Sequence, residues 1–349
     1  MVRTPSSQAP PADRGLHTVR QHTPSPVYIG DMHFHSFFAS RRHDSRPLGP
    51  MMAAGPATLL SWALVGDLLW IERWRRGIRQ KATPRQGEPH AWFRRELQRM
   101  TAHVAEQGLK IVRQPADVDQ ALAGVPHIVL AVEGASFIEQ DVRSVREAYE
   151  LGIRQLQLVH YIRNPLGDFQ TTRPEHDGLT NLGKAVIREC NRLGMLIDLA
   201  HCSAAAVADA LAISRAPMVW SHSSVATSGA PHWSMIAWKA RQLTLPQARA
   251  IARQGGVIGV WALRQDVGAT LQSYGDRMAQ LAELIGEDHV GFGSDINGLG
   301  PFAVADSMAD LGQVVTHWRT KGLGDARIRK LAIGNFARVL RAAMVARRG

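Results

Sequence analysis

Histidine and acidic side chains stand at the ends of apolar runs throughout this chain. There are six such runs: Val27–His35, Ile128–Glu133, Gln155–His160, Leu196–His201, Met218–His222 and Val290–Asp295. Imidazole and carboxylate groups ligate metals and carry protons. In a parallel α/β sheet, active sites form at the carboxyl ends of the strands. The pattern therefore predicts one site that a whole sheet assembles, with ligands suited to a pair of metal ions.

The first run carries two histidines, His33 and His35, which alternate along one strand and so face the same side of it. Such a pair can hold one metal ion through two imidazoles. Alone it is a weak signal in a chain with 15 histidines, and two unrelated histidines are the alternative. The other runs favour the metal site.

Glu133 closes an otherwise apolar strand, where an unpaired charge costs several kcal/mol. A bridging metal ligand explains this position better than a structural ion pair. His201 and His222 would complete a second metal site with it. Two ions about 3.5–4 Å apart, sharing Glu133 and a water, form a hydrolytic pair in which the water ionises to hydroxide and attacks a carbonyl.

Three further residues have candidate roles in catalysis or substrate binding. Asp295 ends the last run and could transfer the proton of the attacking water, or could cap the following turn. His160 could donate to the substrate carbonyl, or be a core histidine bonded to backbone. Arg241 could bind a substrate carboxylate, although arginine is common in this chain and is usually solvated.

The elements that position these residues alternate between strands and helices. Two more runs, Ser61–Leu69 and Gly256–Ala262, bring the strands to eight, which predicts an α/β fold of the (β/α)₈ TIM-barrel type, as in metal-dependent hydrolases. We expect residues 27–349 to form a single barrel catalytic domain, with extra helices within 72–125. Residues 1–26 are rich in Pro, Ser and Thr and predict a disordered tail.

Two connecting segments bear on the site. Asn181–Leu193 has one apolar stripe, with Thr180 as its N-cap and Gly194 as its stop, and predicts a helix. Asn164–Gly178 is polar and turn-rich and follows the fourth strand on the active-site side, so it is a candidate substrate loop.

Bulk properties exclude several classes of protein. The net charge of +11 is compatible with nucleic-acid binding. However, the arginines are scattered along the chain and no nucleic-acid-binding motif accompanies them. Cys190 and Cys202 cannot form a disulfide framework, and we expect both to be packing thiols. Met51–Ile71 is long enough to suggest a membrane span, but Gly55-Pro56 and Asp67 favour a short helix and a buried strand. We expect a cytoplasmic protein that neither spans a membrane nor binds nucleic acid.

These motifs resemble the membrane dipeptidase (renal dipeptidase) family of zinc metallopeptidases, within the amidohydrolase-like barrels. The likeness runs from about residue 27 to 340 and is most specific in the block 177–203 and in SHSS. The matching stretches are DMHFH at 31–35, AVEGA at 131–135, LVHYIRNPLGD at 158–168, residues 177–203, PMVWSHSSV at 217–225, ARQLT at 240–244, GGVIGVWA at 255–262, HVGFGSDINGL at 289–299 and IGNFARVL at 333–340.

The resemblance implies a barrel with two zinc ions that hydrolyses dipeptides. It places His33 and His35 on one zinc, Glu133 as the bridge, and His201 and His222 on the other. Asp295 matches the family's proton-transfer acid, His160 its carbonyl-contacting histidine, and Arg241 its arginine for the substrate carboxylate. By resemblance we also expect a homodimer.

Departures from the family pattern lie near the substrate. His35 stands where the family has aspartate, Trp261 and its neighbours replace an NFY-like run, and Asn297 replaces an acid. The sequence therefore predicts hydrolysis of a dipeptide or small N-acyl amino acid, and leaves two alternatives open. The same metal site could act on a lactone or another non-peptide substrate, or the barrel could be a non-catalytic binding protein.

Overall fold

The computed structural model describes residues 1, 26–36, 47–74, 77–226 and 237–346. The tail expected over 1–26 lies almost entirely outside these residues.

Eight parallel strands close into a barrel. They are β1 (Ile29–Phe34), β2 (Ala57–Val65), β6 (His127–Glu133), β7 (Ile153–Gln157), β8 (Leu196–Asp198), β9 (Val219–Ser223), β12 (Val257–Val260) and β13 (Val290–Phe292). The sheet runs β2-β1-β13-β12-β9-β8-β7-β6, and β2 also pairs with β6, which closes the ring. The short β5 (Lys110–Ile111) pairs with β6 beside it. The predicted (β/α)₈ barrel is confirmed.

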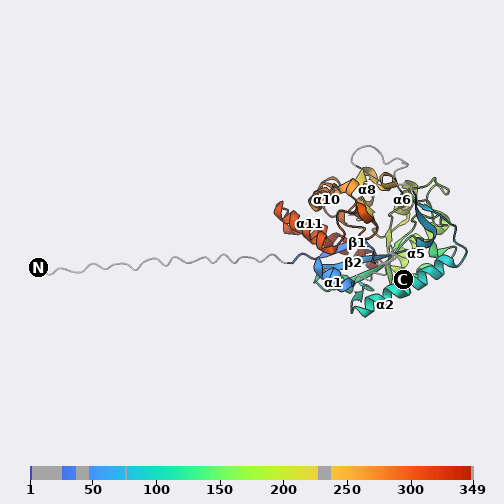
Figure 1. The fold of residues 1–349 in the computed structure, drawn as a ribbon, viewed down its shortest axis with the longest axis horizontal. Coiled ribbons are helices and arrows are strands. Elements are labelled where there is room, and N and C mark those ends of the chain that lie inside the picture. The colour runs from blue at the N-terminus through green and yellow to red at the C-terminus, as the bar shows by residue number, and fades with distance from the viewer. Residues whose placement is uncertain (2–25, 37–46, 75–76, 227–236, 347–349) are drawn as a thin grey trace.

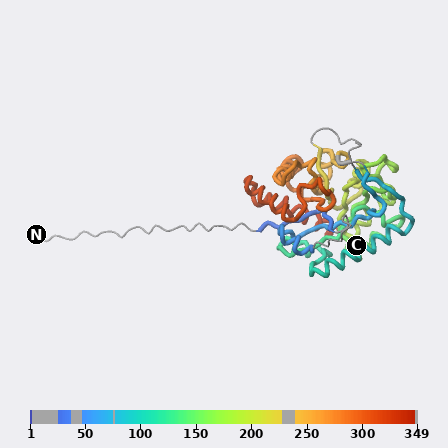
Figure 2. The backbone as a smooth tube through the Cα atoms, in the orientation of Figure 1, coloured from blue at the N-terminus to red at the C-terminus, as the bar shows by residue number. Residues whose placement is uncertain are grey.

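Chain order follows the circumference of the barrel. The first strand pairs with the last, β1 with β13, so in Figure 2 the blue N-terminal segments adjoin the red C-terminal ones. The helices surround the strands, as Figure 1 shows for those that it labels. The longer helices are α2 (Glu88–Glu106), α5 (Asn181–Leu193), α6 (Ala204–Ile213), α8 (Leu245–Arg253), α10 (Leu271–Ile285), α11 (Met308–Thr320) and α13 (Asn335–Val345).

Helix α5 has the ends expected from its sequence. The Thr180 hydroxyl accepts a hydrogen bond from the Gly183 N–H, and Gly194 follows in a left-handed conformation with φ 79°. Its apolar stripe, including Cys190, is buried against the barrel. Local capping and the apolar stripe together determine both the bounds and the orientation of this helix.

The second strand begins four residues earlier than the sequence pattern indicated. Helix α1 (Leu48–Ala54) stops at Gly55-Pro56, and the Pro56 carbonyl accepts from the Ile29 N–H, so pairing with β1 begins at once. β2 therefore ends at Val65, and Leu68–Trp70 form a short 3₁₀ turn, η1. The apolar stretch from 51 to 71 is thus a helix and a buried strand. Among the described residues, no helix has the length and apolar character needed to cross a membrane.

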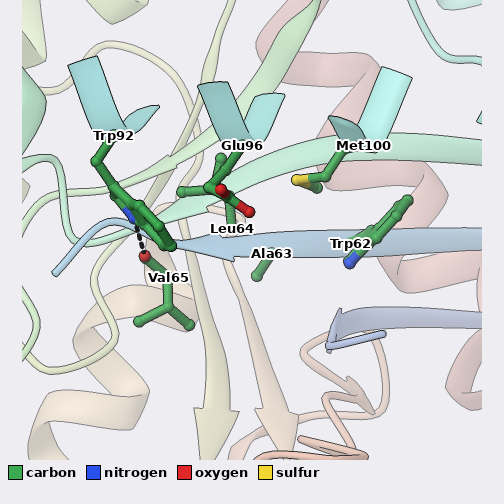
Figure 3. Close-up of a pocket in the computed structure, with 7 residues that line it drawn as sticks. All are labelled: Trp62, Ala63, Leu64, Val65, Trp92, Glu96 and Met100. Atoms are coloured by element: carbon green, nitrogen blue, oxygen red, sulfur yellow. Dashed lines mark hydrogen bonds between the residues drawn. The ribbon is translucent and has the colours of Figure 1, made fainter. Parts of the chain in front are cut away.

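Apart from β5, the described residues between 71 and 125 form an insertion on the outside of the barrel. It contains a hairpin of β3 (Ile71–Trp74) and β4 (Gly77–Gln80), then α2 and α3 (Pro115–Leu122). Helix α2 packs on β2, where the Trp92 indole N–H donates to the Val65 carbonyl at 3.0 Å. Figure 3 shows this contact and a cavity of about 10 Å³, lined by Trp62, Ala63, Leu64, Val65, Trp92, Glu96 and Met100. Space for no more than about one water marks this contact as packing, not a binding site.

Candidate metal centre at the carboxyl ends of the strands

Five imidazoles converge on one buried carboxylate. The Nε2 atoms closest to Glu133 Oε1 are those of His33 (3.5 Å), His160 (3.4 Å), His201 (3.3 Å) and His222 (3.4 Å). His35 Nε2 lies 3.6 Å from Glu133 Oε2. Because these residues come from β1, β6, β9 and the segments after β1, β7 and β8, barrel closure is what brings them together.

His35 faces the centre together with His33. Their Nε2 atoms are 3.1 Å apart and their rings meet edge to face. His35 Nε2 is also 3.4 Å from Asp295 Oδ1. An imidazole therefore occupies the place at which the resembling family has an acid, and Asp295 supplies a carboxylate beside it.

The outward nitrogens of four of these rings have partners. His35 Nδ1 contacts the Ala63 carbonyl at 3.0 Å, and Ser221 Oγ lies 2.9 Å from His222 Nδ1 and 3.4 Å from His33 Nδ1. Asp67 Oδ1 is 2.6 Å from the Nδ1 of the fourth ring, His160. Metal-binding histidines usually have such outer partners, which fix the ring and direct Nε2 to the ion. Among the described residues, His201 Nδ1 has no hydrogen-bond partner.

Burial keeps three of the histidines neutral. It lowers the pKa of His33, His201 and His222 well below the usual range, and nearby positive groups, including Arg241, act in the same direction. Neutral imidazole is the form that binds a metal ion.

Acidic neighbours have the opposite effect on His35. Burial alone would lower its pKa, but the hydrogen bond to Asp295 and the charges of Glu133 and Asp295 raise it. Burial raises the pKa of Glu133, whereas the charges of His160 and His35 lower it by a smaller amount. A carboxylate in this position is costly without a cation, which fits a site built for one.

Two residues of the centre have strained backbones. His201 has φ 69° and Asp295 has φ 55°, the left-handed region that non-glycine residues rarely adopt. Such strain is typical of functional sites, where the surroundings hold a side chain in place. The Asp295 side chain faces His35, while its carbonyl accepts from the Gly298 N–H, so the acid reaches the centre while its backbone forms the turn.

Arg241 is buried, not solvated. It ends the short helix α7 (Ala237–Arg241) and is 1 % exposed. Its Nη1 contacts His201 Nε2, and its Nη2 donates to the His222 carbonyl at 3.3 Å. The guanidinium also lies 5.4 Å from the ring centre of Trp261, whose indole N–H donates to Asp266 at 2.6 Å. A fork-shaped cation at this depth can bind an anionic group of a substrate.

The candidate substrate loop passes directly beside His201. The Gln170 N–H donates to the His201 carbonyl at 2.8 Å, and Phe169 forms a bridge with Cys202. Asp168 holds the loop together by accepting from three backbone N–H groups, those of Glu175, His176 and Gly178.

Sequence reasoning missed several residues around the centre. Asp67 and Ser221 contact the outward nitrogens described above, and Tyr161 packs its ring on His160 and His201 at 4.4 and 4.9 Å. Asp31 and Asp198 bind backbone N–H groups of the strand ends, including those of Ser294 and Ser221. Asp31 and Asp198 are acids inside two of the apolar runs, and this unusual position is the feature of the sequence that could have identified them.

The donor set fits a metal ion. Three groups of buried side chains have their potential ligand atoms within 4.8 Å of one another: His33 with Glu133 and His222, His33 with His35 and Asp295, and Glu133 with His160 and His201. Imidazole and carboxylate suit zinc and related transition metals. The centre can therefore hold metal through several histidines and a shared glutamate.

Comparison with known proteins agrees with this geometry. The family model of the membrane dipeptidases (peptidase family M19) matches residues 91–349, more than half of the chain. The chain belongs to the membrane dipeptidase family. The matched part includes Glu133, His160, His201 and Asp295, whereas the His33–His35 pair precedes it.

Two curated relatives are dipeptidases. Dipeptidase verJ of Clonostachys rogersoniana is 30% identical over 219 residues, 61% of this chain and 54% of that protein. Dipeptidase tcpJ of Claviceps purpurea (strain 20.1) is 29% identical over 247 residues, 69% of this chain and 54% of that protein. The chain thus spans about half the length of the curated relatives it matches.

Solved structures share the fold. A metallopeptidase from Rhodobacter sphaeroides, liganded with a phosphinate mimic of the dipeptide L-Ala-D-Ala, has a TM-score of 0.73 at 22% identity and covers 91% of this chain and 99% of its own. The probable dipeptidase PvdM from Pseudomonas aeruginosa has a TM-score of 0.74 at 20% identity, with 92% and 96% covered. At these identities the likeness concerns the barrel alone.

Proposed function

We propose that this chain is a binuclear zinc hydrolase that cleaves the amide bond of a dipeptide or small N-acyl amino acid. The observation that carries the proposal is the convergence of five histidine Nε2 atoms on buried Glu133, with Asp295 beside them. In this proposal His33 and His35 hold one ion, His201 and His222 hold the other, and Glu133 contacts both.

The remaining residues act on the substrate. When bound, the metal pair would acidify a water and polarise the scissile carbonyl. Asp295 accepts the proton of that water and returns it to the leaving amine, which its position next to His35 allows. His160 steadies the carbonyl oxygen, and Arg241, buried beside His201, binds the substrate carboxylate.

The test combines metal analysis with a hydrolysis screen. Purified full-length chain is analysed for zinc and other metals and assayed against a dipeptide panel, before and after chelation and zinc addition. Arg241→Met should raise KM for substrates with a free carboxylate far more than for their amides. Absence of metal, together with no hydrolysis after zinc or manganese is added, would refute the proposal. We also propose a homodimer on the strength of the family, which light scattering on the purified chain tests directly.

A second candidate keeps the metal centre but takes a lactone or another non-peptide substrate. The buried Trp261 favours this candidate. Its ring centre lies 6.3 Å from the ring centre of His222 and 5.4 Å from the central carbon of the Arg241 guanidinium. A bulky ring there changes the part of the site that would meet the substrate's carboxylate end. Lactone hydrolysis without dipeptide hydrolysis, and indifference to Arg241→Met, would decide for this candidate.

A further inference from the structure

Asp67, in the turn after β2, is a buried acid to which the proposed function gives no role. It is 1 % exposed, and its two carboxylate oxygens have separate partners. Oδ1 lies 2.6 Å from His160 Nδ1. Oδ2 accepts from the backbone N–H groups of Tyr161 and Ile162 at 2.9 and 3.2 Å. The carboxylate therefore binds one ring and the backbone just after it.

Close backbone approach makes this arrangement possible. The Gly66 N–H donates to the Glu133 carbonyl at 2.8 Å, and a Cβ on Gly66 would lie 2.1 Å from the Gly134 carbonyl oxygen. A Cβ on Gly134, which has φ 83°, would lie 2.8 Å from His160 Cβ. Two glycines thus let the ends of β2, β6 and β7 approach closely enough for Asp67 to reach His160.

A purely local structural role does not account for the Asp67 side chain. Asp67 precedes the 3₁₀ turn η1, but its side chain makes no capping hydrogen bond to that turn. Its contacts reach across 93 to 95 residues of sequence. The side chain is therefore directed toward His160 and away from its own turn.

We propose that Asp67 is a positioning residue that accepts a hydrogen bond from the Nδ1–H of His160 and so holds the ring with its Nε2 edge toward Glu133 and the substrate. Without an acceptor at Nδ1, nothing would hold the ring in this orientation. The proposal rests on the proposed function, in which His160 contacts the substrate carbonyl. It adds a second residue, on a different strand end, without which that contact is misaligned.

The structure predicts what Asp67→Asn does to the ring. The backbone N–H groups of Tyr161 and Ile162 require an acceptor, so the amide oxygen of the variant must face them. Its NH₂ group then faces His160 Nδ1, and two donors cannot share a hydrogen bond. The ring must therefore give up the proton on Nδ1 or turn away, although the volume of the side chain at position 67 is unchanged.

A double-mutant cycle tests the functional part. The zinc-loaded full chain is compared with Asp67→Asn, His160→Gln and the double variant, on the substrate that the wild type hydrolyses best. We expect Asp67→Asn to lower kcat about 10- to 100-fold with little change in zinc content, and to lower it less than about 2-fold in the His160→Gln background. Equal losses in both backgrounds would assign Asp67 a structural role and overturn the proposal.

NMR of ¹⁵N-histidine-labelled protein supplies a readout independent of activity. The His160 resonances are those that His160→Gln lacks, and they should show a protonated, hydrogen-bonded Nδ1 in the wild type and the loss of that proton in Asp67→Asn. The matched control is Asp168→Asn, which alters another buried carboxylate, one that accepts from the backbone N–H groups of Glu175, His176 and Gly178, and should leave these resonances in place. Unchanged His160 resonances in Asp67→Asn would overturn the proposal. If the wild type hydrolyses nothing, the proposed function fails, while the NMR result still decides whether Asp67 holds the ring.

Discussion

Replacing Glu133 with glutamine should have opposite effects on the metal-free and the zinc-loaded protein. Without metal, the ionised carboxylate is disfavoured in the fold, because burial raises its pKa. A group with a raised pKa contributes stability at low pH that is lost as the pH rises through the raised value. The metal-free variant, which cannot ionise, should therefore become more stable than the wild type as the pH rises from the usual carboxyl range to 8.

With zinc the order should reverse, since the Glu133 carboxylate lies within 3.6 Å of five imidazole nitrogens. If its loss weakens zinc binding about 1,000-fold, the stabilisation at zinc 1,000 times the wild-type Kd falls by about 4 kcal/mol. At an unfolding entropy of about 2.1 cal/mol/K per residue, 1 kcal/mol shifts the Tm of a 349-residue chain by about 1.4 °C. The zinc-induced rise in Tm should therefore shrink by about 6 °C.

Differential scanning calorimetry of chelated and zinc-loaded protein at several pH values measures both effects. The matched control is Glu96→Gln, because Glu96 is another buried acid, paired with Arg99 at 2.7 Å on the outer helix α2. It should leave the zinc-induced shift unchanged. An equal zinc-induced shift in wild type and Glu133→Gln would refute the assignment of Glu133 to the metal centre.

Three further predictions concern Asp295 in its proposed role, the two thiols and the half-buried carboxyl of Asp266. Asp295→Asn should retain zinc yet lower kcat about 10²- to 10⁴-fold, because the amide cannot accept the proton of the attacking water; unchanged turnover at full metal content would contradict this role. Cys190 and Cys202 should resist a thiol reagent in native protein at pH 8, because burial raises the pKa of both thiols; rapid labelling without unfolding would be inconsistent with their packing. Burial raises the pKa of Asp266 to about 6, so the wild type should lose roughly 1–3 kcal/mol of stability relative to Asp266→Asn as the pH rises from about 4 to about 6. Denaturant unfolding of both proteins across that range measures the difference, and parallel curves would contradict it.

The barrel could be predicted because its strands are buried on both faces. Every residue of β1, β2 and β6 is buried, so β2 and the middle of β6 stand out as largely apolar runs, and the polar residues of β1 stand among apolar ones. The order of the runs then determines the topology, because parallel strands with helical crossovers close in chain order. Strand bounds were less predictable. The strands β8 and β13 end at Asp198 and Phe292, three residues before His201 and Asp295, and both of those residues have a positive φ that no pattern of apolar residues indicates.

The error in the second strand explains why Asp67 was missed. Apart from Arg241, the candidates came from one rule, an acid or histidine where a buried strand ends. Placing the strand at Ser61–Leu69 put Asp67 inside it, where it appeared only as a residue that disfavours a membrane span. With the strand ending at Val65, Asp67 stands two residues beyond it and obeys the same rule as Asp295 and His201. The register of β2 depends on Pro56 and on pairing with β1, contacts that a periodicity of apolar residues does not encode. An error of four residues in one strand was therefore enough to hide an acid that contacts the ring of His160.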